Sequence, residues 1–397
     1  MKNLIVKLKS QFNRYDVDGY IVPKNDEFFS EYSNKDRLKI ISNFTGSAGY
    51  AVILKNKNYL FVDGRYTLQA KIECGKNFEI INYDKLFKCK VFKNLKLGMD
   101  PTLFTQKQIQ NFFSNNNIKS IKKNLVDEIV KLKIINNKPF YSLDKKIAGE
   151  SHQAKMTKII NFLKRNKLDY IFITAPENVA WLLNIRGYDN PNSPIPNSNL
   201  IVGRNKKKFI IANKDKLKKI IKQKKVNKKE IVEPQNIEKF FNELKGKNIS
   251  IDNKTCSIYH EEILNKKFDV IKNEDPIYLL KSKKNLTEIN NMIQAHISDG
   301  VALTKFIYWI KEINKKRISE VDAQNKLEKF RKQNKNYLFP SFNTIAGSGG
   351  NGAIVHYRAT NTNKRYINKN DIFLCDSGGQ YKYGTTDVTR TICFSKK

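Results

Sequence analysis

Short apolar runs separated by polar segments mark the beginning of the chain. A β-strand is predicted at Tyr20–Val22, and a loop rich in small residues covers Ile40–Gly49. A pair of strands follows at Tyr50–Leu54 and Tyr59–Val62, joined by a short polar turn. The next residues, Asp63–Tyr66, are expected to open a helix. This order of elements is typical of a mixed α/β domain.

The same order of elements returns in the second third of the chain. It comprises a strand at Tyr170–Ile173, a stretch at Ala180–Gly187, a proline-rich loop, and strands at Asn199–Val202 and Phe209–Ala212. Repetition on this scale indicates a duplicated domain. We therefore predict a domain at 1–138 and a second domain of the same plan at 139–276.

The last third, 277–397, opens with a long helix. Asn285 can cap it, and Glu288 occupies the capping-box position three residues later. An apolar stripe at helical spacing follows, and we expect His296 to pack or hydrogen-bond within it. A second helix is predicted after Ser319. The stripe comprises Ile289, Met292, Ile293, Ile297, Val301 and Tyr308.

Two aspartates stand on the closing hairpin of the chain. If its turn centres on Tyr381 and Lys382, Asp376 and Asp387 face each other, with Cβ atoms about 4.5–5.5 Å apart. Carboxylates that close repel each other unless a cation lies between them. Oxygen ligands favour hard ions such as Mn²⁺, and two ions about 3.5–4 Å apart could be clasped by such a pair. A lone aspartate would suggest an ordinary strand end, but two facing aspartates favour a metal site.

His356 ends an apolar run that follows the glycine-rich loop Gly347–Gly352. Its imidazole suits proton transfer or hydrogen bonding to a substrate, although a structural role is the simpler interpretation for an isolated histidine. Beside the aspartate hairpin we favour the functional role. The loop lacks the Gly-Lys-Ser/Thr ending of a phosphate-binding loop, and Cys375 should face the core.

The charge balance adds little to this picture. Seventy-four Lys and Arg against 38 Asp and Glu give a net charge of +36, but the lysines are spread along the chain. We expect nonspecific attraction to polyanions and no specific nucleic-acid function. No run approaches the length of a membrane span. The five cysteines form no CxxC pair, which fits a reducing, cytoplasmic environment better than a disulfide scaffold.

These motifs together resemble the creatinase/aminopeptidase P ("pita-bread") metallopeptidase family, and in particular its three-domain Xaa-Pro aminopeptidases. The resemblance covers nearly the whole chain. It is carried by Phe44–Gly49, Asp63–Tyr66, Ala180–Gly187, Asp299–Leu303, Gly352–Tyr357 and the aspartate hairpin.

The resemblance implies two creatinase-like α/β domains followed by a pita-bread catalytic domain, and an α/β (α+β) fold class. It implies a homodimer and a dinuclear centre, usually manganese, that activates a hydroxide. The substrate would be a peptide with proline in second position, which loses its N-terminal residue. Asp376 and Asp387 would be metal ligands, and His356 would bind substrate and assist proton handling.

The family's site also needs a histidine and two glutamates downstream of the hairpin, and no residue up to Lys397 matches them. We therefore expect a truncated copy or fragment with an incomplete pita-bread domain at 277–397, impaired metal binding and little peptidase activity. The alternative is a non-catalytic pita-bread module that binds peptides. A nucleic-acid binder is a third and weaker interpretation.

Overall fold

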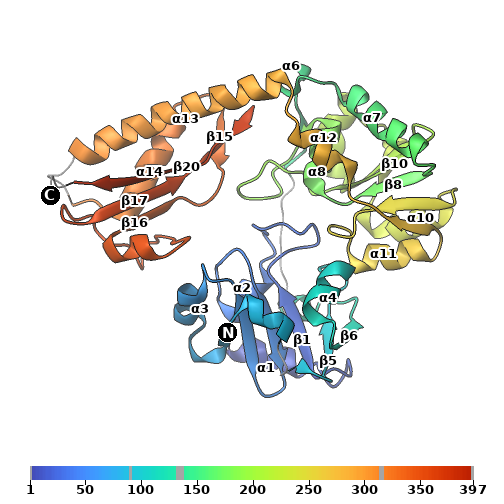
Figure 1. Ribbon diagram of the computed structural model, residues 1–397, viewed down its shortest axis with the longest axis horizontal. Helices are drawn as coiled ribbons and strands as arrows, with labels where there is room; N and C mark the ends of the chain where they lie inside the picture. Colours follow the sequence, from blue (N-terminus) through green and yellow to red (C-terminus); the bar gives the residue numbers. More distant parts are fainter. Residues whose placement is uncertain (1, 89–91, 131–137, 313–316, 395–397) are drawn as a thin grey trace. The chain divides into compact units, whose positions relative to one another are not determined.

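The computed structural model describes residues 2–88, 92–130, 138–312 and 317–394 (Figure 1). The chain forms two compact units. The first comprises Met1–Leu143 and Glu150–Lys283, and the second comprises Asp144–Gly149 and Lys284–Lys397. The predicted mixed α/β fold class is confirmed, because both units combine sheets with helices. The predicted boundaries at 138/139 and 276/277 stay a prediction.

A six-stranded sheet forms the first part of the first unit, in the order β4-β3-β2-β1-β5-β6. Its central strands β1 and β2 are buried along their whole length, which explains their continuous apolar runs. The strands are β1 (Gly19–Pro23), β2 (Tyr50–Leu54), β3 (Asn58–Val62), β4 (Glu79–Asn82), β5 (Lys96–Met99) and β6 (Asn117–Ser120). The helices are α1 (Lys2–Lys9), α2 (Arg37–Ser42), α3 (Thr67–Cys74), α4 (Gln106–Phe113) and α5 (Leu125–Ile129).

A second six-stranded sheet has the same topology, in the order β12-β11-β10-β8-β13-β14. Its β10 is antiparallel to β8 and β11, as β2 is to β1 and β3. The repeated plan expected from the sequence is thus present. The strands are β8 (Tyr170–Ile173), β10 (Asn199–Gly203), β11 (Lys208–Ile211), β12 (Ile231–Val232), β13 (Asn248–Ile251) and β14 (Asp269–Lys272), with β7 (Tyr141–Ser142) and β9 (Ile185–Arg186) forming a separate pair. The helices are α7 (His152–Arg165), α8 (Pro176–Leu183), α9 (Lys218–Lys222), α10 (Ile237–Glu243), α11 (Ile258–Asn265) and α12 (Pro276–Ser282).

Helices and two small sheets make up the second unit. Its long helix is α13 (Leu286–Glu312), and the predicted capping box is present, because Asn285 and Glu288 exchange backbone-to-side-chain hydrogen bonds of 2.9 and 3.0 Å. The helix predicted after Ser319 is α14 (Glu320–Arg331), and α6 (Lys145–Ala148) also belongs here. The strands are β15 (Tyr337–Pro340), β16 (Ile345–Ser348), β17 (Ile372–Ser377), β18 (Gly379–Tyr381), β19 (Gly384–Thr385) and β20 (Val388–Cys393).

The apolar stripe of α13 does not lie in the core. Ile293 and Ile297 are each about half exposed. The buried side of the helix carries other apolar residues, such as Ala295, Leu303 and Phe306. His296 is exposed, and its Nδ1 lies 2.9 Å from the carbonyl oxygen of Met292. The helix was therefore predicted correctly. The apolar stripe, however, lies on the face of α13 that is exposed among the described residues.

Helix α14 and the sheet β16-β17-β20 enclose the core of the second unit. Phe306 and Leu327 pack from the two helices against Phe373 and Cys375 of β17. Cys375 is 1% exposed, so the prediction that it faces the core is confirmed. Cys74 and Cys256 are likewise buried thiols, and Cys89 lies outside the described residues.

Candidate metal centre in the closing hairpin

The closing hairpin passes from one three-stranded sheet into the other. Its first arm changes sheet at Gly378, between β17 and β18, and its second arm changes at Thr386 and Asp387, between β19 and β20. At this crossing a Cβ on Gly378 would lie only 2.0 Å from the carbonyl oxygen of Thr386. The glycine is therefore required, because the two arms approach too closely for a side chain. Asp376 and Asp387 flank the crossing.

The expected direct pairing of Asp376 with Asp387 is wrong. Asp376 is paired with Thr389, and the two-residue turn is formed by Lys382 and Tyr383. The turn lies one residue later than predicted because the side chain of Tyr381 is buried and its hydroxyl donates a 2.9 Å hydrogen bond to Asp299. Tyr381 is thereby kept in strand β18, and the register moves by two residues.

Asp387 nevertheless lies near enough to Asp376 for its charge to act on that carboxyl group. Asp387 directly precedes β20, whose first residue Val388 is paired with Ser377, the residue after Asp376. Asp387 is exposed and Asp376 is half-buried.

The electrostatics of Asp376 connect it to both other predicted site residues. Burial raises the pKa of its carboxyl group above the ordinary range, and the negative charge of Asp387 raises it further. The Thr389 hydroxyl opposes this by donating a 2.8 Å hydrogen bond to the carboxylate, and His356 also lowers the pKa. His356 and Asp387 thus both act electrostatically on Asp376, whereas the roles of the three stay a prediction.

His356 lies in a turn that follows the glycine-rich loop. The expected apolar run Ala353–Tyr357 forms the end of a 3₁₀ turn and a β-turn closed by a 3.1 Å hydrogen bond from the Tyr357 amide to the carbonyl oxygen of Ile354. His356 occupies the third position of this turn with φ of +57°, in the left-handed region. Such a conformation persists only where surrounding contacts hold it, and it is enriched at functional sites.

Both carboxylates suit a hard divalent cation. They offer oxygen ligands, and the repulsion from Asp387 that raises the pKa of Asp376 would be relieved by a positive ion. Among residues 2–88, 92–130, 138–312 and 317–394, no group of three or more His, Cys, Asp or Glu could hold a metal ion. The two aspartates thus fit as part of a ligand set.

Three residues that support the hairpin were missed by the sequence analysis. Thr389 was given no role, although it is the direct partner of Asp376. Arg331 and Glu320, both on α14, carry buried hydrogen bonds to the hairpin and to the loops around His356. Their only signal in the sequence was a charged side chain on a helix, which is ordinarily exposed.

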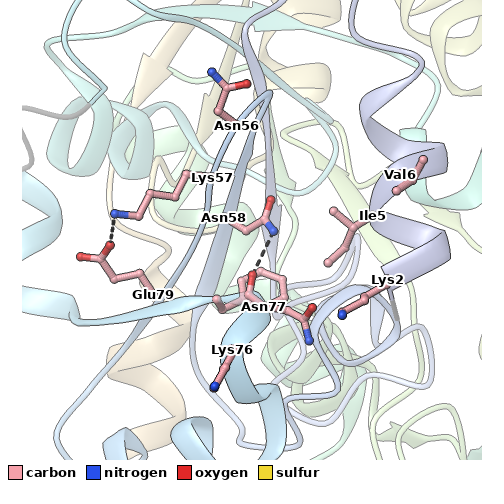
Figure 2. Close-up of a pocket in the computed structure, with 10 residues that line it drawn as sticks. Lys2, Ile5, Val6, Asn56, Lys57, Asn58, Lys76, Asn77 and Glu79 are labelled. Atoms are coloured by element: carbon pink, nitrogen blue, oxygen red, sulfur yellow. Dashed lines mark hydrogen bonds and ion pairs between the residues drawn. The ribbon is translucent and has the colours of Figure 1, made fainter.

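A pocket of about 530 Å³ lies elsewhere, in the first unit (Figure 2). Lys2, Lys57 and Lys76 line it together with Asn58 and Glu79. Figure 2 shows Lys57 in an ion pair with Glu79, and Asn58 donating a 2.9 Å hydrogen bond to a backbone oxygen of Asn77. The pocket holds no histidine and no pair of carboxylates, so the hairpin remains the candidate site.

Comparisons with known protein families match all three parts of the chain. The description "Creatinase/Prolidase N-terminal domain" matches residues 5–129 and, in a second form, residues 131–288. "Metallopeptidase family M24" matches residues 290–397, which contain the hairpin. Within the part of the chain that the structure describes, no helix is long and apolar enough to cross a membrane.

Similar proteins are named as aminopeptidases. The "Probable Xaa-Pro aminopeptidase P" of Laccaria bicolor is 32% identical over 98% of this chain and 64% of its own length. The protein of the same name from Pyricularia oryzae is 32% identical over 99% of this chain and 69% of its own length. The chain thus spans about two thirds of the length of the curated relatives that it matches.

One solved structure covers the whole chain. The X-prolyl aminopeptidase of Caenorhabditis elegans, described as a cytosolic enzyme with a di-nuclear active site, superposes with a TM-score of 0.89. It is 27% identical, and this chain covers 70% of it.

Proposed function

Because the chain belongs to the Xaa-Pro aminopeptidase P family of M24 metallopeptidases, we propose that the protein removes the N-terminal residue from peptides with proline in second position. The observation that carries the proposal is the pair of aspartates at the hairpin crossing, where Asp387 and His356 both act electrostatically on Asp376. The matched relatives and the solved X-prolyl aminopeptidase support the substrate class.

In this proposal the two aspartates of the hairpin bind metal ions, and His356 binds the peptide and transfers a proton. Asp376 and Asp387 would hold two divalent ions as part of a ligand set, with manganese favoured by their oxygen donors. When bound, such ions lower the pKa of water from about 15.7 to about 7. His356 would orient the peptide and move a proton at its imidazole, and Thr389 would keep the Asp376 carboxylate in place.

We test the metal site by titrating Mn²⁺ into the protein by isothermal calorimetry. Asp376→Asn and Asp387→Asn should each weaken binding by at least about 100-fold, because each removes an ionised ligand and replacing even an outer-shell partner costs 10–100-fold. Asp269→Asn is the matched control, since Asp269 is an exposed strand residue of β14 in the other unit. Equal affinity in all three variants would rule out the hairpin as the metal site.

Peptide cleavage and peptide binding separate the proposed enzyme from the alternative. Mn²⁺-dependent release of the residue before proline, lost in Asp376→Asn, supports the aminopeptidase. Binding of the same peptide without cleavage at saturating Mn²⁺ supports the non-catalytic pita-bread module. Replacing His356 with Ala should lower kcat more than it raises KM if the imidazole acts in proton transfer.

We further propose a cytoplasmic protein that forms homodimers. The location is supported by the cytosolic relative from Caenorhabditis elegans, and the dimer by the family resemblance alone. Sedimentation velocity of the purified protein measures the assembly directly.

A further inference from the structure

A buried carboxylate holds the loops on both sides of His356. Glu320 is the first residue of α14, where the partial positive charge of the helix N-terminus favours an anion, and its side chain is fully buried. Its backbone amide also donates a 3.0 Å hydrogen bond to the carbonyl oxygen of Arg365. The side chain therefore enters the protein from a fixed point of the helix.

Four donors from two separate loops converge on the Glu320 carboxylate. Oε1 accepts from the Ser348 amide at 2.7 Å and from the Asn351 side chain at 3.1 Å. Oε2 accepts from the Tyr357 hydroxyl at 3.0 Å and from the Arg365 amide at 2.8 Å, and it also lies 3.1 Å from the Asn351 side chain. A buried carboxylate is expensive unless it is hydrogen-bonded, and here all the donors come from the segments 348–351 and 357–365.

These donors bracket His356 in the chain. Asn351 begins the turn leading to it, and Tyr357 follows it directly. The Asn351 side chain also donates a 2.9 Å hydrogen bond to the Tyr357 hydroxyl. The residues on the two sides of His356 are therefore bonded to each other as well as to Glu320. The left-handed backbone of His356 needs such support, because a non-glycine residue adopts it only when its neighbours are fixed.

We propose that Glu320 is a positioning residue that sets the place of His356 at the candidate site. It acts through Asn351 and Tyr357 and touches no reacting group. The proposal rests on the proposed function only for the role of His356 in peptide cleavage. The effect of Glu320 on the position of His356 does not depend on that function.

The imidazole NMR spectrum of the labelled protein tests the proposal without any need for turnover. The chain has only four histidines, so each Cε1–Hε1 signal can be resolved, and His356→Asn assigns the relevant one. Glu320→Gln replaces an acceptor by an amide whose NH₂ faces donors. We expect it to shift the His356 signal and to leave those of His152, His260 and His296 in place.

Hydrogen exchange measures the same effect on the backbone. In Glu320→Gln, residues 348–365 should exchange at least about tenfold faster, the loss expected for hydrogen bonds to a charged acceptor, while β17 and β20 keep their wild-type rates. Glu320→Asp retains the charge and should recover part of the protection. Glu328→Gln is the matched control, because Glu328 lies on the same helix and accepts a 2.6 Å hydrogen bond from the Tyr337 hydroxyl.

The outcomes separate positioning from general stability. An unchanged His356 signal in Glu320→Gln overturns the proposal, and so does a change of all four histidine signals with faster exchange throughout the second unit. If Glu320→Gln is insoluble, Asn351→Ala is judged by the same criteria. In a protein that cleaves Xaa-Pro peptides, Glu320→Gln should lower kcat and have no further effect in a His356→Ala background. Absence of cleavage counts against the proposed function, and the NMR result still decides on Glu320.

Discussion

At the scale of single residues, the hairpin crossing depends on the absence of a side chain at Gly378. A Cβ there would meet the Thr386 carbonyl oxygen at 2.0 Å and the Ser341 hydroxyl at 2.2 Å. Ser341 joins the two arms of the hairpin. Its hydroxyl donates to the Thr386 carbonyl oxygen at 2.8 Å, and its amide donates to the Gly378 carbonyl oxygen at 3.1 Å. A methyl group at position 378 would force the two arms apart and so displace the segments that carry Asp376 and Asp387.

We predict that Gly378→Ala destabilises the second unit by at least about 2–3 kcal/mol, since the backbone itself must move. Gly300→Ala is the control: this glycine is inside α13 with no atom within 4 Å of an added Cβ, so its replacement should stabilise by up to about 1 kcal/mol. Urea unfolding followed by Trp309 fluorescence in a Trp181→Phe background measures both. Equal effects of the two substitutions would contradict the close approach at the crossing.

At the scale of elements, a buried ion pair joins helices α13 and α14 of the second unit to the hairpin. Arg331 of α14 donates to both carboxylate oxygens of Asp299 on α13, at 2.7 and 3.0 Å, and to the Ser377 hydroxyl at 3.0 Å. Both charged side chains are at most 3% exposed. Because Ser377 follows Asp376, the ion pair fixes the end of β17 next to the candidate metal ligand.

Arg331→Met should therefore cost about 3–5 kcal/mol of unfolding free energy, because Asp299 is left buried without its cation. The control is the neighbouring Lys332→Met, which removes an exposed ion pair with Glu328 and should cost less than about 1 kcal/mol. The Trp309 fluorescence assay applies here too. A loss below 1 kcal/mol for Arg331→Met would show that solvent reaches Asp299.

Element positions followed from the sequence more readily than the contacts between elements. Apolar runs located β1, β2, β3, β8, β10 and β11, and cap residues located the starts of α13 and α14, since these signals are local. The register of the hairpin did not follow, because it depends on the burial of Tyr381 against a helix 82 residues earlier in the chain. The apolar periodicity in α13 likewise predicted an apolar face of the helix but not which elements pack against it.

At the scale of the whole molecule, the net charge of +36 is distributed over a large exposed surface and did not help to find the site. The motifs selected the candidates His356, Asp376 and Asp387, because three polar residues in a specific sequence context carry more information than composition. They did not select Glu320, because its contacts form only when segments distant in sequence fold onto it.

Asp275 should make the stability of the first unit depend on pH. It is 4% exposed, and burial raises its pKa to about 6. Hydrogen bonds from the Ile277 amide and the Asn178 side chain oppose this shift, and the charge of Asp252 adds to it. The folded protein thus keeps a proton that the unfolded chain releases near pH 4. Stability is therefore highest below the unfolded pKa and falls as the pH rises to about 6, by roughly 3 kcal/mol.

The change that tests this is Asp275→Asn, which can retain the 2.9 Å cap on the Ile277 amide but does not titrate. Urea midpoints between pH 4 and 7, followed by Trp181 fluorescence in a Trp309→Phe background, should fall in the parent protein relative to the variant. Parallel curves for the two proteins would mean that Asp275 keeps its ordinary pKa when folded.

The passage of one hairpin through two sheets also has a consequence for the time course of folding. β17 must pair with β16, and β18 with β15, before the crossing is fixed, and these partners are 25 to 44 residues apart in the chain. Closing such loops is slower than forming a local turn. The carboxylates of Asp376 and Asp387 should therefore come together late, and the appearance of metal binding during refolding would report the completion of this unit rather than its beginning.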